Sequence, residues 1–347
     1  MFKYFKKNDP LRIIALVFII IITRLGFFLF SDAGKAALDN ITNFVQSPSE
    51  NDSSSSFFTH SGPLSDLIFS GIDVLGWPLI SIVIASLLIL FNSIFLNSMF
   101  IRNSSFEESS FLPAAIFVIL MSGSKSFYFL SPALLGSSFL LVSLNYLFHH
   151  IKYRGTEENI LNTGFTIGIA CLFYYPYFWL YFLVLIIYLF YSSTISRRYF
   201  LMTWGFVLPV LIVWLVFYFN GTGVDFASTF FGRIVNVQEM GTGLNRGLTI
   251  LSAGLVLTII SAIQSFQGLG MTNHQILVQK AMNWTGFFGV LLFAVFGNES
   301  LIGLILIIPT LSYFSTKMLT SLTKRALAEF LFLALIGATI ATALLAY

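Results

Sequence analysis

Residues Ser31 to Gly76, SDAGKAALDNITNFVQSPSENDSSSSFFTHSGPLSDLIFSGIDVLG, form the longest stretch of the chain that is not predominantly apolar. Six acidic residues lie in it against one cation, Lys35, and it contains the low-complexity run Asn51 to Ser56. Nearly all of the remaining sequence consists of apolar segments separated by short polar turns. The stretch is therefore a hydrophilic connector within a chain of apolar helices.

The composition is that of a membrane protein. Of the 347 residues, 57% are hydrophobic and 10% are charged, with a mean hydropathy of +0.87. Soluble domains carry about 25% charged residues, so this chain cannot build a water-exposed globular surface. The net charge of +3 argues against a nucleic-acid partner. Cys171, the one cysteine, excludes an intrachain disulfide. Residues 1–347 are expected to form a single transmembrane domain.

The apolar segments predict an all-α, polytopic transmembrane helix bundle with about 11 spans. The predicted spans are Leu11–Phe30, Trp77–Asn97, Phe111–Gly123, Ser131–His150, Asn159–Tyr174, Tyr177–Tyr191, Tyr199–Phe219, Gly247–Phe266, Met282–Phe296, Leu301–Phe314 and Ala326–Ala346. Those that begin at 111, 159, 177 and 301 are too short for a full crossing. Residues 159–191 are either two short helices divided at Pro176 or one kinked helix.

The basic residues orient these spans. With a cytoplasmic N-terminus, thirteen of the 18 lysines and arginines fall on cytoplasmic segments and four fall outside. Such a bias is typical of membrane proteins, whose cytoplasmic loops are enriched in these residues. The odd number of spans places the C-terminus outside, together with the connectors 31–76 and 220–246. Arg24, late in the first span, is expected to extend outward to the interface.

The candidate site lies on these two outer connectors. Apolar residues at helical spacing, around Ala37–Val45 and Leu64–Leu75, predict two short helices lying along the membrane surface. Asp32 and Asp39 are seven residues apart, as are Asp66 and Asp73, so each pair would project from one helix face. A carboxylate at this level could serve as a general base or bind a divalent cation. In the second connector, Arg233 and Arg246 suit a lipid-linked phosphate.

Motifs for other chemistries are missing from the sequence. Gly241-Thr-Gly243 lacks the lysine and the strand–helix context of a phosphate loop, and no zinc motif occurs. The predicted spans contain almost no ionisable residues, which weighs against an ion-coupled carrier. The polar residues within the spans are small ones of the kind that pack helices together: Ser137, Ser138, Asn145, Asn162 and Thr166.

Two resemblances add to these observations. An acidic residue soon after the first span, an outer loop with two surface helices, and the segments Leu130–Leu135, Asn162–Leu172 and Ser196–Arg198 resemble the GT-C class of membrane glycosyltransferases. The opening Met1–Pro10, Leu112-Pro113 and Gly168–Pro176 are similar to an uncharacterised family of multi-spanning bacterial inner-membrane proteins. The second resemblance implies a multi-pass protein of the bacterial inner membrane.

The first resemblance implies sugar transfer from a polyprenyl-phosphate donor on the outer face. Asp32 and Asp39 would then be catalytic, Asp66, Asp73, Arg233 and Arg246 would bind substrate, and a divalent cation could assist. The chain lacks the adjacent acidic pair of that class, so a non-catalytic scaffold or subunit of an envelope export or assembly complex is an equal alternative. A lipid or solute transporter is a third. Membrane lipid is the expected partner in each case, and further membrane proteins are expected in the second.

Overall fold

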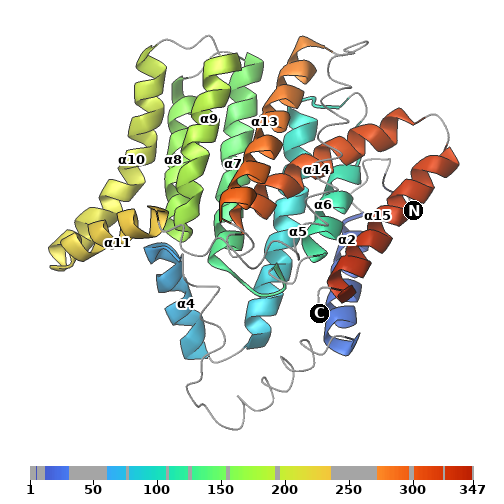
Figure 1. The fold of residues 1–347 in the computed structure, drawn as a ribbon, viewed down its shortest axis with the longest axis horizontal. Helices are drawn as coiled ribbons and strands as arrows, with labels where there is room; N and C mark the ends of the chain where they lie inside the picture. Colours follow the sequence, from blue (N-terminus) through green and yellow to red (C-terminus); the bar gives the residue numbers. More distant parts are fainter. Residues whose placement is uncertain are drawn as a thin grey trace, which may run out of the picture.

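The computed structural model describes Phe5 and residues 12–30, 61–75, 78–106, 109–123, 127–153, 157–191, 196–235, 272–296, 301–322 and 325–345. Within these ranges the fold is all-α, as predicted (Figure 1). Its elements are α2 (Arg12–Phe30), α4 (Pro63–Leu75), α5 (Pro78–Arg102), α6 (Leu112–Ser122), α7 (Pro132–Tyr153), α8 (Glu157–Phe173), η3 (Tyr175–Tyr177), α9 (Phe178–Tyr191), α10 (Ser196–Phe219), α11 (Gly223–Val235), α13 (Asn273–Phe296), α14 (Ile302–Ser321) and α15 (Arg325–Leu345).

Ten of the predicted spans coincide with a helix, and the remaining one, Gly247–Phe266, lies outside the described residues. Two predicted boundaries were wrong. Helix α13 begins at Asn273, nine residues before the predicted start, and α14 continues seven residues beyond the predicted end to Ser321. Both errors come from polar residues such as Gln279 and Lys317, which bond to each other inside the bundle and so extend the helices.

The helices are compatible with an integral membrane protein. Five of the described helices are long and apolar enough to cross a membrane: Ile80–Arg102, Pro132–Tyr153, Arg197–Phe219, Asn273–Val295 and Ile302–Ser321. Helix α6, with 11 residues, spans only about 16 Å and cannot cross a hydrocarbon core of about 30 Å. It is instead enclosed by its neighbours, with nearly every side chain buried. The total of eleven spans stays a prediction.

The division at Pro176 produces two helices, which resolves the alternative left open above. Helix α8 ends at Phe173, Tyr174 is extended with φ −147° and ψ 108°, and η3 leads into α9. Proline disfavours helical backbone in the residue before it and lacks an N–H, which favours a kink or a break at this point. Helices α10 and α14 continue through Pro209 and Pro309, whereas the extended backbone of Tyr174 ends α8 before Pro176.

Helices α8 and α10 pack closely because glycines face each other at their crossing. A Cβ atom on Gly164 would lie 2.2 Å from the carbonyl oxygen of Met202, and one on Gly205 would lie 2.3 Å from that of Leu161. Such small residues allow membrane helices to approach backbone to backbone. A glycine also allows close packing where α13 crosses α14, since a Cβ on Gly303 would lie 2.6 Å from the Cβ of Phe293.

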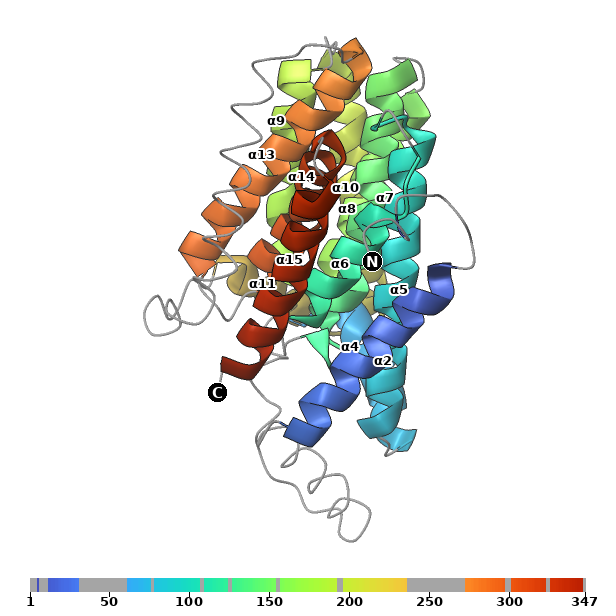
Figure 2. The same cartoon turned by 90° about the vertical axis from the view of Figure 1, so that its right-hand side faces the viewer.

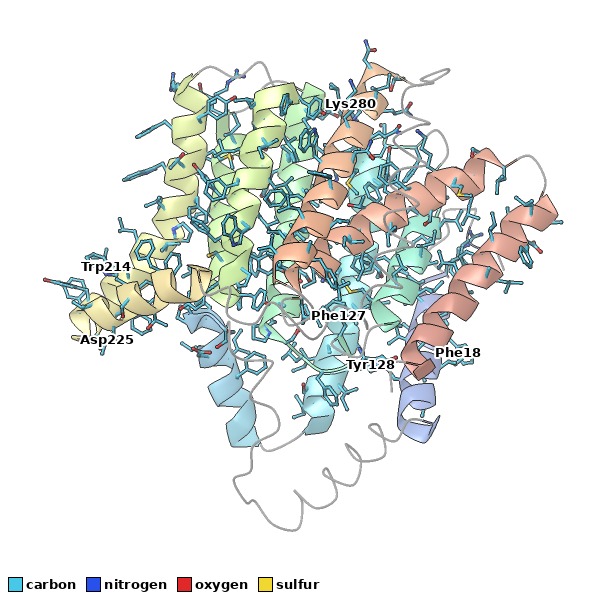
Figure 3. All side chains as sticks on the ribbon, in the orientation of Figure 1. Phe18, Phe127, Tyr128, Trp214, Asp225 and Lys280 are labelled. Carbon is cyan, nitrogen blue, oxygen red and sulfur yellow. The ribbon has the colours of Figure 1, made fainter. Side chains whose placement is uncertain are left out.

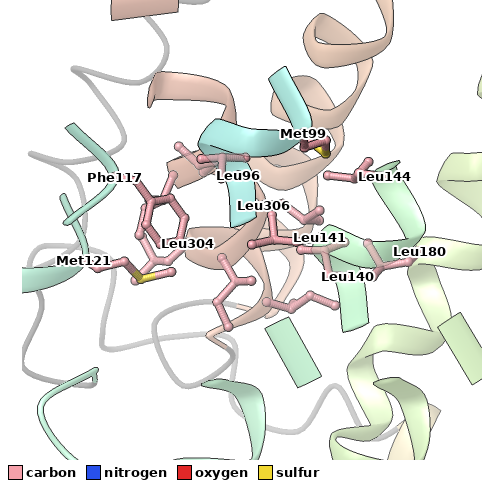
Figure 4. Close-up of a cluster of buried hydrophobic side chains, with 14 of the residues drawn as sticks. Leu96, Met99, Phe117, Met121, Leu140, Leu141, Leu144, Leu180, Leu304 and Leu306 are labelled. Carbon is pink, nitrogen blue, oxygen red and sulfur yellow. The ribbon is translucent and has the colours of Figure 1, made fainter. Parts of the chain in front are cut away.

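Helix α14 forms the middle of the structure. It is nearly completely buried and runs crosswise to α7, α8 and α9 in Figure 1, and Figure 2 shows α15 passing over its outer side. The hydroxyl of Ser312 donates to the carbonyl of Pro113 (2.6 Å), which ties α14 to α6. Figure 4 shows the surrounding core, in which leucine, methionine and phenylalanine side chains from α5, α6, α7, α9 and α14 interlock.

The two ends of the bundle differ in character. At one end, Lys152 Nζ donates to the carbonyl of Arg102 (3.0 Å), and the ring of His274 bonds to the carbonyl of Asn103 (2.7 Å). Arg197 also pairs with Glu157 there at 3.2 Å. These contacts join the end of α5 to the end of α7 and the start of α13, and they join the starts of α8 and α10. The charge bias assigns this end of the bundle to the cytoplasm. Lys280 lies at this end and Asp225 at the opposite end (Figure 3).

Candidate functional site at the outer end

The end opposite to the one that the charge bias assigns to the cytoplasm, called the outer end below, is organised around the turn between α8 and α9. Tyr174, Tyr175 and Tyr177 are all buried in this turn, and the hydroxyl of Tyr177 donates to the carbonyl of Ala133 on α7 (2.7 Å). A Cβ on Gly136 would lie 2.2 Å from the Tyr177 ring, so only glycine leaves room for it. The turn is thereby fixed to the bundle and offers a rigid base on which the outer connectors can dock.

The first connector docks on this base through its last segment. Ser61 forms an isolated antiparallel bridge with Tyr174, and the N–H of Gly62 donates to the carbonyl of Phe173 (2.9 Å). A Cβ on Gly62 would lie 2.0 Å from the carbonyl oxygen of Leu172, a distance that no side chain tolerates. In the first turn of α4, the hydroxyl of Ser65 donates a hydrogen bond to the carbonyl of Gly62 (2.6 Å). The start of α4 is therefore held against the end of α8.

The second connector docks on the same turn through α11, a helix that the sequence did not predict. Gly221 adopts φ +81°, a left-handed conformation that favours glycine, and reverses the chain after α10. Phe226 stacks on Phe217 with ring centroids 5.1 Å apart, and Phe230 meets the ring of Tyr175 edge-on at 5.4 Å. The described parts of both connectors thus lie at one end of the molecule, as the orientation of the spans predicts.

The predicted site residues divide into three groups. Asp66 lies in the first turn of α4 and is exposed. Asp73 lies near the end of α4 and Arg233 lies near the end of α11, but their side chains are outside the described part. The start of α4 contacts Phe173 and Tyr174, and α11 contacts the neighbouring Tyr175. Asp32, Asp39 and Arg246 also lie outside the described residues. In the described part, no group of three His, Cys, Asp or Glu residues could hold a metal ion.

Helix α4 does not lie flat across the end of the bundle, as a surface helix would. In Figure 1 it extends away from the end of α8, roughly along the direction of the long helices. Its start is anchored at Gly62, and Phe69 is buried against the core. Helix α11 is the one that runs across the end of its neighbour, α10 (Figure 1).

Arg24 is a site that the sequence interpretation missed. The expected outward extension of its side chain was wrong, because Arg24 is buried at 6% exposure. Its guanidinium donates to the carbonyls of Tyr128 and Phe127, the latter at 2.8 Å, and lies 4.6 Å from the centre of the Tyr128 ring. Phe127 and Tyr128 belong to the segment that leads into α7 (Figure 3). An arginine well inside an apolar run was the available signal, since such residues usually face the bundle interior.

The polar residues within the predicted spans connect helices. Asn92 on α5 donates to Ser137 (2.9 Å) and accepts from Ser138 (2.8 Å), both on α7. Asn145 accepts a longer hydrogen bond from Asn103 (3.4 Å). The Thr166 hydroxyl donates to backbone carbonyls of its own helix. Their expected role in helix packing is thus confirmed for Ser137 and Ser138.

Comparisons with known proteins identify no relative: no protein-family model matches the chain, and no curated protein and no solved structure shows significant similarity to it.

Proposed function

We propose that this protein acts on a lipid-linked phosphate at the outer face of the bacterial inner membrane, by transferring a sugar from a polyprenyl-phosphate donor. One observation carries the proposal: α4 and α11, which bear Asp66, Asp73 and Arg233, dock on the same rigid turn. Acidic and basic residues from connectors about 150 positions apart in sequence are thereby brought to one end of the bundle.

The chemistry would require two kinds of group. Asp32 or Asp39 would take the proton of an acceptor hydroxyl as its oxygen bonds to the anomeric carbon of the sugar. The bond between that carbon and the phosphate oxygen would break, leaving the lipid phosphate with the negative charge. Arg233 and Arg246 would stabilise this phosphate by charge-assisted hydrogen bonds, and Asp66 and Asp73 would orient the substrate or hold a divalent cation.

Complementation of a deletion strain tests this proposal. The Asp32→Ala/Asp39→Ala double variant should abolish or strongly reduce restoration of the surface glycan, and so should the single variant that removes whichever aspartate is the base. Arg198→Gln, a substitution at the opposite end of the bundle, serves as the control and should complement fully. If all three aspartate variants restore the glycan profile at wild-type protein levels, sugar transfer by these residues is excluded.

A second candidate is a non-catalytic subunit of an envelope export or assembly complex. It is favoured by the scarcity of ionisable residues in the predicted spans and by the missing adjacent acidic pair. Purification in mild detergent separates the two proposals, because a subunit should copurify with a stoichiometric membrane partner. A transporter would need polar side chains that line a path through the bundle. It is less well supported, because Asn92, Ser137 and Ser138 form hydrogen bonds with one another between α5 and α7.

A further inference from the structure

Helix α11 has two apolar faces, of which the bundle covers only one. Phe226 and Phe230, four residues apart, are buried against Phe217 and Tyr175. Val224 and Phe231 are seven residues apart, hence in nearly the same direction, and are 83% and 66% exposed. A helix that only capped the bundle would have polar residues at these two positions.

The remaining side of α11 is polar. Asp225 and Ser228, three residues apart, are both exposed, and Gly232 continues the same side. The Ser228 hydroxyl donates to the carbonyl of Asp225 (2.9 Å), so it is satisfied within its own helix and requires no partner from the bundle. Around the helix, the order is therefore a buried apolar face, an exposed apolar face and an exposed polar face.

The direction of α11 matches this distribution. It runs across the end of α10, whereas α10 is one of the helices long and apolar enough to cross a membrane (Figure 1). A helix at such an angle to a spanning helix lies along the membrane plane. Exposed apolar residues also lie at the end of α10, just before α11 in the sequence, where Tyr218 is 58% and Phe219 is 82% exposed. Lipid that surrounds α10 would therefore reach α11 without interruption.

We propose that α11 is an interfacial helix embedded in the outer leaflet, with Val224 and Phe231 among the acyl chains and Asp225 and Ser228 facing water. Membrane lipid covers its second apolar face, because amphipathic helices lie at the boundary between the lipid headgroups and the acyl chains. The placement holds whether or not the protein transfers a sugar.

Spin labelling tests the placement directly. The chain offers a clean background, since its one cysteine, Cys171, is fully buried and can be replaced by serine. Single cysteines at positions 224, 231, 225 and 232 are labelled with a nitroxide, and the full-length protein is reconstituted in phosphatidylethanolamine–phosphatidylglycerol vesicles. Collision of each label with oxygen, which concentrates in the hydrocarbon, is compared with collision with a water-soluble nickel chelate.

Val224→Cys and Phe231→Cys should show an oxygen-to-nickel ratio several-fold higher than Asp225→Cys and Gly232→Cys, which are matched controls about 80–120° away around the same helix. Equal ratios at all four positions would overturn the proposal. So would labels at 224 and 231 that neither reagent reaches, since that result indicates protein packed over the face. A variant is included only if it elutes and unfolds like the parent, and all four positions are exposed, so folding should be preserved.

Discussion

Arg24 shows how one residue decides the arrangement of distant segments. A charged side chain in an apolar helix is costly unless polar groups surround it, and here two backbone carbonyls and an aromatic ring do so. Arginine suits the position because its planar guanidinium can donate to both carbonyls at once. The contact joins α2 to the segment before α7, about 100 residues later in the sequence.

Arg24→Met should destabilise the protein by about 2 kcal/mol or more, because two buried carbonyls lose their donors. Arg24→Lys should fall between wild type and Arg24→Met, since an ammonium keeps the charge but not the planar pair of contacts. Thermal unfolding in detergent, followed with a thiol-reactive dye that reports exposure of Cys171, measures both. Arg197→Gln, which removes an exposed ion pair, is the control and should cost less than about 1 kcal/mol. Equal stability of Arg24→Met and wild type would contradict this role.

Among the elements, the crossing of α8 and α10 depends on glycine more than on any large side chain. Gly164→Ala or Gly205→Ala should cost about 1–3 kcal/mol, because the new methyl group meets backbone that cannot yield. Gly26→Ala in α2 should have the opposite sign, since nothing lies within 4 Å and alanine is the better helix former. The same thermal assay compares the Gly164→Ala and Gly205→Ala variants with Gly26→Ala. A stabilised Gly164→Ala variant would disprove the close packing of α8 and α10.

The start of α4 rests on a different glycine, Gly62. Gly62→Ala should detach α4 from the end of α8 and leave the bundle intact, because the clash is confined to the backbone of Leu172 and Phe173 at that end. Hydrogen–deuterium exchange should then increase several-fold in the peptide that covers residues 63–75, with no change in α8. Unchanged exchange in α4 would show that its contacts with the bundle do not depend on this approach.

The whole molecule has two distinct ends, and the orientation predicted from its charges can be tested. In a Cys171→Ser background, Asp66→Cys and Ser228→Cys should react with a membrane-impermeant maleimide in intact spheroplasts. Lys280→Cys should react only after permeabilisation. All three positions are exposed, so access depends on the side of the membrane alone. Labelling that places 66 and 228 in opposite compartments would refute the shared outer end, and with it the proposed function.

The sequence alone determined the all-α class and the positions of ten apolar helices, because runs of apolar residues act locally on the backbone. At Pro176 it left open one kinked helix or two short helices, and the structure shows two. It missed α11, whose turn at Gly221 and two apolar faces are too short a pattern to separate from a polar connector. It also misjudged Arg24, since whether such a side chain extends to the interface or turns inward depends on which carbonyls lie nearby. Only the tertiary structure decided that α4 and α11 share the η3 turn and that α14 crosses the core. Those arrangements depend on close helix contacts at Gly62, Gly164, Gly205 and Gly303. The sequence shows where the glycines are but does not show which segment packs against each of them.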